Sequence, residues 1–283
     1  MRIVSLLPSG TEIVYALGLG GYLVGVSHRC DYPTDAASLP VVTARIPGSG
    51  CRPKGVPSPF ELNIARLTEL QPDVVLTQSI CDVCAISGDT VARALQQLTR
   101  APSIVELNAA SLDDVLANIM RIGNYCGASD AARHLVDSIT KRVQERGTSG
   151  REAPRVLCLE WLEPLRAAAV WVPDLVRLAG GTPLLGQSRQ RSSPMTKRDL
   201  ATCRPDIVIA MPCGLDLPTT RNTVARTRLG LLFPDSSMYA FDGRVPSRHG
   251  PRLADVAESF AEIFTTAPGP WAGFLYERIE STQ

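Results

Sequence analysis

Two cysteines separated by two residues, Cys81 and Cys84, form the sharpest chemical feature of the sequence. Such a pair can be half of a zinc site, with Cys213, His28 or Cys30 as further ligands. It can also be a redox pair, because the pair is expected between a strand and the start of a helix, where a thiol pKa is lowered. The third interpretation is a loop of small side chains that packs against a large ligand or against itself. The spacing leaves all three interpretations open.

Aromatic and imidazole side chains provide a second set of candidates. Trp161 and Trp171 flank a proline-containing loop after a predicted strand, where an indole either covers the core or forms a wall for a flat ligand. His134 is expected on a solvated helix face, whereas His28 and His249 fall in loops and are candidates for ligand contact. The motifs of serine hydrolases, P-loop nucleotidases and HExxH metalloproteases are absent. The sequence therefore does not look like that of a hydrolase or an NTPase.

The composition argues against several classes of function. The 29 basic and 28 acidic residues are spread along the chain and give a formal net charge of +1, which is no footprint for nucleic acid or for an anionic membrane. No apolar run reaches the roughly 18 residues of a transmembrane helix, so no membrane insertion is expected. The first strand is expected to begin at Arg2 with no signal peptide before it, which predicts a cytoplasmic protein. Eight cysteines in 283 residues are too sparse for a disulfide framework.

The same order of features occurs twice along the chain. Residues 67–81 and 200–213 each read as a helix end, a Pro-Asp turn, a buried strand and a loop with a cysteine. The two turns place Asp73 and Asp206 at an offset of 133 residues, as the numbering of the sequence shows. Each half also opens with an arginine followed by an apolar strand. Strands alternating with helices indicate parallel sheets, so we expect two related α/β halves.

A long amphipathic stretch, Ser129–Gly147, lies between the two halves. Ser129 is a plausible N-cap, and apolar residues that include Val136 and Ile139 recur at helical spacing. At 1.5 Å per residue this helix would be roughly 28 Å long, which suits a rod between two lobes. The sequence therefore predicts an N-terminal lobe at 1–128, a bridging helix at 129–147 and a C-terminal lobe at 148–283. In the second lobe we expect a last strand at 238–241, a helix at 253–264 and a short helix at 271–279.

Ligands of open α/β sheets bind beyond the carboxyl ends of the strands. If the two halves face each other, six loop sets line one cleft: Pro8–Gly10, Ser27–Asp31, Gln78–Ala85, Glu160–Trp171, Pro212–Asp216 and Asp242–Arg252.

The chain closely resembles the substrate-binding proteins of vitamin B12 and metal-chelate ABC transporters. The resemblance begins with RIVSLLPSGTEIVYALGLGGYLVGVSHRCDYP at residues 2–33. It continues through LQPDVVLTQSICDVCAIS, VLCLEWLEP, WVPDLVRLAGG, PDIVIAMPCGLD and FDG…GPRL, and so covers nearly the whole chain. The QxxCxVCA and MPCGxD elements resemble the cobalamin-binding branch. The resemblance implies the class III periplasmic-binding-protein-like fold, in which two Rossmann-like lobes are joined by one helix and the ligand lies in the cleft.

The resemblance implies reversible binding of a corrinoid, either cobalamin or cobinamide, by a monomer that serves uptake through an ABC permease or intracellular handling. By match or by position it assigns the ligand contacts to Pro8, Ser9, Arg29, Gln78, Cys81, Cys84, Trp161, Trp171, Cys213, Asp242 and Arg248. Arg29 stands where a related binding protein has an aromatic contact. The alternative from the cysteines is a cytoplasmic metal-binding or thiol-redox protein that uses Cys81, Cys84 and Cys213.

Overall fold

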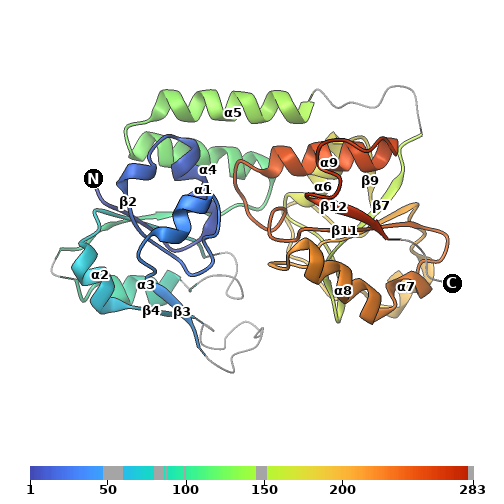
Figure 1. Cartoon of the computed structure of the whole chain (residues 1–283), viewed down its shortest axis with the longest axis horizontal. Helices are drawn as coiled ribbons and strands as arrows, with labels where there is room; N and C mark the ends of the chain where they lie inside the picture. Colours follow the sequence, from blue (N-terminus) through green and yellow to red (C-terminus); the bar gives the residue numbers. More distant parts are fainter. Residues whose placement is uncertain (47–59, 80–85, 87, 99, 145–151, 280–283) are drawn as a thin grey trace. The chain divides into compact units, whose positions relative to one another are not determined.

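The structure is a computed structural model that describes residues 1–46, 60–79, 86, 88–98, 100–144 and 152–279. The chain divides into two compact units. Unit 1 comprises Met1–Asn108 and Leu116–Val136, and unit 2 comprises Ala109–Val115 and Asp137–Gln283. Each unit is an α/β structure with its own sheet (Figure 1). The lobe boundaries expected at 128 and 147 stay a prediction.

Unit 1 contains a four-stranded sheet in which neighbouring strands are parallel. Across the sheet the strands are β2 (Leu23–Val26), β1 (Ile3–Ser5), β5 (Val74–Thr77) and β6 (Ser103–Glu106). A separate antiparallel pair consists of β3 (Thr43–Arg45) and β4 (Phe60–Leu62). The described helices are α1 (Pro8–Ala16), α2 (Ile64–Leu70), α3 (Gly88–Leu95) and α4 (Leu112–Tyr125). Figure 1 shows α1 and α4 on one face of this sheet and α2 and α3 on the other, as expected for a buried parallel sheet.

Unit 2 contains a six-stranded sheet centred on the long strand β7 (Arg155–Leu162). On one side of β7 lie β10 (Ile207–Ala210), β11 (Ser237–Phe241) and β12 (Tyr276–Ile279), and on the other lie β9 (Thr182–Pro183) and β8 (Leu165–Ala167). Helices α6 (Val172–Leu178) and α9 (Leu253–Thr265) cover one face, and α7 (Lys197–Thr202) and α8 (Leu217–Thr227) cover the other (Figure 1). Short 3-10 helices lie at Gly20–Tyr22 and Thr34–Ser38 in unit 1 and at Leu229–Leu231 in unit 2.

The parallel parts of the two sheets have the same strand order, which confirms the expected repeat. The order β2-β1-β5-β6 in unit 1 matches β9-β7-β10-β11 in unit 2. The Pro-Asp turns have the same task in both units. A carboxylate oxygen of Asp73 accepts from the main-chain N–H of Arg2 at 2.8 Å, and one of Asp206 accepts from that of Arg155 at 2.7 Å. Each turn thus fastens the start of one strand to the start of its neighbour.

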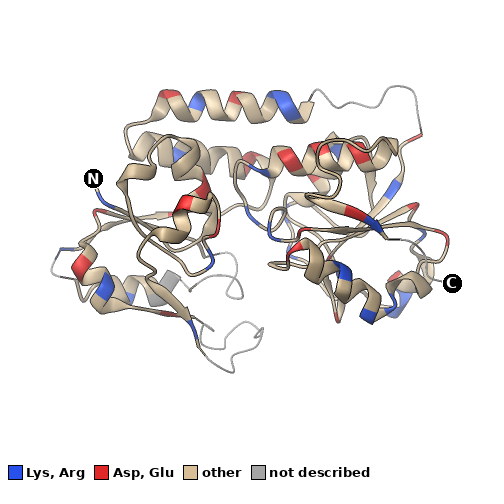
Figure 2. Ribbon diagram, in the orientation of Figure 1, with Lys and Arg blue, Asp and Glu red and all other residues tan. Residues whose placement is uncertain are grey.

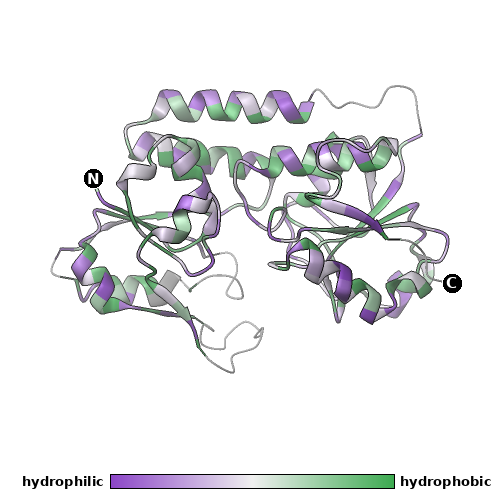
Figure 3. Cartoon of the chain, in the orientation of Figure 1, coloured by the Kyte–Doolittle hydropathy of each residue, from purple (hydrophilic) through white to green (hydrophobic). Residues whose placement is uncertain are grey.

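The cores lie on both faces of the two sheets, where apolar residues of strands and helices meet (Figure 3). In unit 1, one cluster joins Val4 and Val75 of the central strands to Val91 of α3. In unit 2, another joins Leu157 and Val208 of the central strands to Val224 of α8. The four-residue strands β5 and β10 are buried along their whole length, which explains their continuous apolar sequence.

Helix α5 (Ser129–Gln144) is continuous over its described length and has residues in both units. Residues 145–147, the end of the predicted helix, lie outside the described residues. Ile139 is buried as expected, whereas Val136 is only half-buried. Acidic and basic side chains alternate along the helix (Figure 2). Helix α4 also has residues in both units, because its first turn belongs to unit 2.

The expectation of a helix at 271–279 is wrong, because the chain turns and then forms strand β12. Gly273 has a φ of +77°, a left-handed conformation that ends any helical path there. Strand β12 then pairs antiparallel with β11 and completes that edge of the sheet. The Tyr276 ring stacks on Phe241, and its hydroxyl donates to Glu262 at 3.1 Å. Edge pairing and ring packing therefore override the helical pattern. Among the described residues, no helix combines the length and apolarity needed to cross a membrane.

Candidate ligand-binding site

The carboxyl edge of the sheet in unit 1 brings together loops from β1, β2 and β5. Pro8 and Ser9 begin α1 directly after β1, and Ser9 is almost fully buried. Arg29, in the loop after β2, is exposed, whereas Gln78, after β5, is buried. The Thr11 hydroxyl donates to the sulfur of Cys30 at 3.1 Å and so ties the start of α1 to the loop after β2. Four predicted contact residues of unit 1 therefore lie on neighbouring strand ends.

The corresponding edge of unit 2 is packed tightly where the loops after β10 and β11 meet. A Cβ on Gly243 would lie 2.0 Å from the carbonyl oxygen of Pro212, so only glycine fits there. This close approach places the loop of Cys213 against the loop of Asp242, which unites two predicted contacts. Cys213 is half-buried, and its main-chain N–H donates to the carbonyl oxygen of Glu160 at 3.0 Å.

Asp242 is engaged by an arginine two residues along the chain. The Arg244 main-chain N–H and Nε donate to Oδ1 of Asp242, both at 3.0 Å, and Nη2 donates to Oδ2 at 2.6 Å. The Asp242 side chain is 8% exposed and that of Arg244 is 39% exposed. Of this ion pair, the Arg244 side chain is therefore the more exposed partner. Sequence reasoning missed Arg244, and the Asp-x-Arg spacing was the one available signal.

Trp171 stands at the start of α6 and is buried. Its Nε1–H donates to the carbonyl oxygen of Pro246 at 2.8 Å, and its ring meets the ring of His249 edge-on at 5.6 Å. These contacts fasten α6 to the loop that carries Arg248, which is also buried. Of the two roles open to Trp171, the cover over the core matches this burial. Trp161 is half-buried, and its Nε1–H donates to the carbonyl oxygen of Glu163 at 3.0 Å.

Two titratable groups at this edge of unit 2 have shifted pKa values. Burial lowers the pKa of His249 to about 4, which leaves the imidazole neutral at pH 7. Burial raises the pKa of Glu160, against the opposing effects of the Ser192 hydroxyl, the Ala169 N–H and Arg166. Glu160 is hydrogen-bonded to Ser192, so the carboxyl group is held within the protein. Both groups therefore have structural partners of their own.

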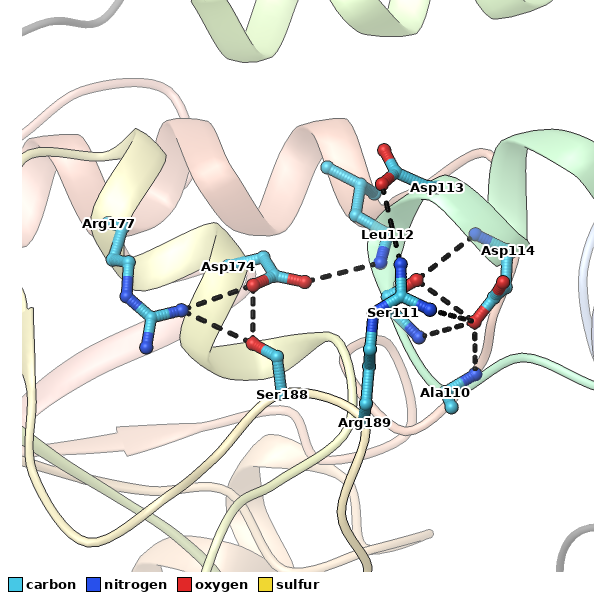
Figure 4. A network of polar contacts seen from close by, with 9 residues as sticks. All are labelled: Ala110, Ser111, Leu112, Asp113, Asp114, Asp174, Arg177, Ser188 and Arg189. Atoms are coloured by element: carbon cyan, nitrogen blue, oxygen red, sulfur yellow. Dashed lines mark hydrogen bonds and ion pairs between the residues drawn. The ribbon is translucent and has the colours of Figure 1, made fainter.

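The segment Ala109–Val115 belongs to unit 2, and a polar network fastens it there (Figure 4). Asp114 accepts from the N–H groups of Ala110 and Ser111 at 2.9 and 3.0 Å, and its own N–H donates to the Ser111 hydroxyl at 3.3 Å. This is a capping box at the start of α4. The main-chain N–H of Arg189 donates a hydrogen bond to the carbonyl oxygen of Ala110 at 2.9 Å.

The same network reaches α6 through Asp174. One carboxylate oxygen of Asp174 accepts from the Leu112 N–H at 3.4 Å, and the other is bonded to Ser188 and to Arg177. As Figure 4 shows, the first turn of α4 and the first turn of α6 are thereby joined within one polar cluster. The loop before α4 is thus held as part of the scaffold of unit 2.

The alternative based on cysteine chemistry stays a prediction, because the structure does not describe two of its three cysteines. Cys81 and Cys84 lie outside the described residues. Cys30, Cys158 and Cys213 are thiols and not parts of disulfides, and burial raises the pKa of the Cys158 thiol. Over the part of the chain that the structure describes, no three His, Cys, Asp or Glu side chains are grouped as metal ligands.

Similar sequences come from bacterial proteins with one common name. The vitamin B12-binding protein of Yersinia pestis (strain Pestoides F) is 25% identical over 213 residues, which are 74% of this chain and 68% of that protein. The protein of the same name from Yersinia pseudotuberculosis serotype O:3 (strain YPIII) has the same identity and coverage.

Solved structures of similar fold include proteins with different ligands. A periplasmic haem-binding protein of Pseudomonas aeruginosa has a TM-score of 0.77 at 19% identity, and the match covers 100% of this chain and 99% of that one. The periplasmic vitamin B12-binding protein of Vibrio cholerae has a TM-score of 0.65 at 21% identity, with 94% and 97% covered. These likenesses confirm the expected class of α/β fold with two sheet-containing lobes.

A family model described as periplasmic binding protein matches residues 3–229, which is most of the chain. This description overturns the expectation of a cytoplasmic protein, which is wrong. That expectation depended on the residues before the first strand, and the family match is the stronger indicator of where the protein acts. The chain belongs to the periplasmic binding protein family.

Proposed function

We propose that this protein binds a corrinoid, cobalamin or cobinamide, reversibly and without converting it, and passes it to an ABC permease. The observation that carries the proposal is the likeness over 213 residues to proteins named for vitamin B12 binding. Structural neighbours that bind haem make haem the ligand to test against it.

The chemistry of the two carboxyl edges suits a corrinoid. The rim of a corrin carries neutral amide side chains, which both donate and accept hydrogen bonds. In unit 1, α1 begins at the carboxyl end of β1, and its N-cap residue, Leu7, makes no side-chain capping bond. The first N–H groups of α1 and the exposed Arg29 supply donors to amide carbonyl oxygens. In unit 2, Arg244 supplies further donors, and the half-buried Trp161 supplies apolar area for a flat ring.

Binding without conversion fits the state of the reactive groups at these edges. The Cys30 sulfur accepts from Thr11, the Glu160 carboxyl is bonded to Ser192, and His249 packs against Trp171. Each of these groups is held by a neighbour in the fold. A pocket with few, fixed polar groups is typical of a binding protein.

Titration of the purified protein with aquocobalamin, dicyanocobinamide and ferric haem tests the proposal. We expect calorimetry to give a Kd of about 1 µM or tighter for a corrinoid, and an affinity for haem at least about tenfold lower. Arg29→Ala should weaken corrinoid binding. Arg100→Ala is the matched control, because Arg100 is 85% exposed and paired with Asp73. Absence of binding by both corrinoids at tens of micromolar would overturn the proposal, and tight haem binding in that case would identify a haem-binding protein.

A further inference from the structure

His28 stands in the loop after β2 in unit 1, one residue before Arg29. The hydroxyl of Thr43 fixes this histidine twice. The His28 main-chain N–H donates to Thr43 Oγ1 at 3.0 Å, and Nδ1 of the ring lies 2.7 Å from the same oxygen. The ring also packs on Phe60, with 5.2 Å between centroids. Main chain and ring are thus held by neighbours from β3 and β4.

These contacts leave one particular nitrogen for an external ligand. Nδ1 faces the Thr43 hydroxyl, and no hydrogen bond to Nε2 is found from the residues that the structure describes. His28 as a whole remains exposed despite its fixed ring. A histidine that coordinates a metal characteristically engages its second ring nitrogen in a hydrogen bond that orients the ring. His28 has this arrangement, with Nδ1 engaged by Thr43.

The surroundings also favour the neutral imidazole, which is the form that coordinates metals. Burial, Arg29 and Arg45 all lower the pKa of His28 below its ordinary value. Near pH 7 the ring therefore keeps a lone pair on one nitrogen. When Nδ1 carries the proton and donates it to Thr43, that lone pair lies on Nε2.

We infer that His28 is an axial ligand, through Nε2, to the cobalt of a corrinoid with an exchangeable axial position. The inference rests on the proposed function and narrows its substrate class. On binding, the axial ligand of cobalt is exchanged: a Co–N bond to Nε2 forms, the Co–O bond to an axial water breaks, and the water leaves. The oxidation state of cobalt does not change. Corrinoids without a base of their own, or with that base detached, are thus bound better than cyanocobalamin, whose two axial positions are filled.

Electron paramagnetic resonance with Co(II) cobinamide tests this assignment, because this corrinoid carries no nitrogenous base. Bound to the unlabelled protein, each cobalt line should split into a triplet from one ¹⁴N ligand. Protein labelled with ¹⁵N-histidine should give doublets instead. The isotope experiment uses the unmodified chain, so it does not depend on the folding of any variant.

Variants then assign the nitrogen to one residue. His28→Ala and His28→Gln should abolish the splitting and lower the affinity for cobinamide by at least about tenfold, with cyanocobalamin affinity changed less. Thr43→Val should keep the splitting but weaken binding, since the ring loses its orienting partner. His134→Ala is the matched control, an exposed histidine on α5, and should behave as wild type.

The outcomes separate this inference from the proposed function. If cobinamide binds but shows no histidine splitting, or if the splitting survives in both His28 variants, the axial assignment is wrong and corrinoid binding stands. If neither cobinamide nor aquocobalamin binds in calorimetry, the proposed function fails and the assignment fails with it.

Discussion

The guanidinium and the main-chain N–H of Arg244 together hold the carboxylate of Asp242, with N–O distances of 2.6 to 3.0 Å. The two residues lie in the turn after β11, so the pair shapes the edge at which a ligand is expected. Asp242 therefore fixes the position of the Arg244 main chain and guanidinium.

Removing the Asp242 carboxylate should both destabilise the fold and weaken binding. Asp242→Ala loses three charge-assisted hydrogen bonds, and we expect the free energy of unfolding to fall by about 2 kcal/mol. Urea denaturation measures this, with Glu277→Ala as the control. Glu277 pairs with Arg221 at 3.5 Å with both side chains exposed, so its loss should cost about 0.5 kcal/mol or less. Equal stabilities of the two variants would show that the Asp242–Arg244 pair contributes nothing.

The glycine at 243 is required by a close approach of main chains. A Cβ there would lie 2.0 Å from the Pro212 carbonyl oxygen, so Gly243→Ala must displace one of two packed loops. We expect a loss of stability of about 2 kcal/mol or more, because strain of this kind cannot relax in a flexible side chain. Gly230→Ala is the control, since nothing lies within 4 Å of its Cβ position. A thermal melt of Gly243→Ala that matches the control would contradict the packing described here.

Arg142 fastens the second half of α5 to α9 by ion pairs with Asp255 at 2.6 Å and Glu258 at 2.8 Å. The two carboxylate side chains are only 17% and 12% exposed, so Arg142→Met removes the guanidinium from two carboxylates that water reaches poorly. We expect destabilisation of about 3 kcal/mol at pH 7 in chemical denaturation. Arg133→Met, which breaks an exposed pair with Asp130, should change stability by about 0.5 kcal/mol or less.

The cost of Arg142→Met should shrink in acid. Burial raises the pKa of Asp255 even with Arg142 present, and removing the guanidinium raises it further. A carboxyl group whose pKa is raised on folding is protonated at a higher pH in the native state than in the unfolded state. The destabilisation that its charge causes therefore fades as the pH falls towards the unfolded pKa. The difference in unfolding free energy between variant and wild type should therefore be smaller near pH 4.5 than at pH 7. A constant difference would argue against buried carboxylates as the cause.

Asp114 should stabilise the start of α4 in a pH-dependent way. Burial acts to raise its pKa, but the Ala110 N–H, the Ser111 hydroxyl and Arg189 outweigh burial and lower it. A lowered pKa means that the stabilisation is present above the unfolded value and is lost as pH falls through the folded one. Asp114→Asn should therefore cost about 1 kcal/mol at pH 7, and this cost should shrink as the pH falls below the pKa of an unfolded aspartate. Asp113→Asn is the control, because Asp113 is 86% exposed.

The sequence predicted the parts of the fold that depend on local pattern. The buried parallel strands and the Pro-Asp turns at Asp73 and Asp206 were readable because a four-residue apolar run after such a turn has one favourable place, the middle of a sheet. Strand β12 could not be predicted from the sequence, because its pairing with β11 and the stacking of Tyr276 on Phe241 depend on residues distant in sequence. A four-residue strand is also too short for its two-residue alternation to be told from a helical pattern.

The candidate site was predictable only as a set of loops. Strand ends identified the loops that carry Ser9, Arg29 and Asp242, since the carboxyl edge of a parallel sheet collects them. Which side chain faces outward could not be read, because Asp242 is engaged by Arg244 and Trp171 by Pro246. Such partners in irregular loops follow from three-dimensional packing and leave no spacing rule in the sequence.

The placement of Ala109–Val115 in unit 2 has a consequence for synthesis on the ribosome. Leu112 meets its partner Asp174 across 62 residues of chain, so α4 leaves the ribosome well before the residues that hold its first turn exist. At roughly 5–20 residues per second, that wait is about 3–12 s. During this time the first turn of α4 has its own capping box, but Asp174, which later accepts a hydrogen bond from it, has not yet been synthesised. A polypeptide terminated after residue 128 would lack both Asp174 and Arg189, so the first turn of α4 would keep only its own capping box.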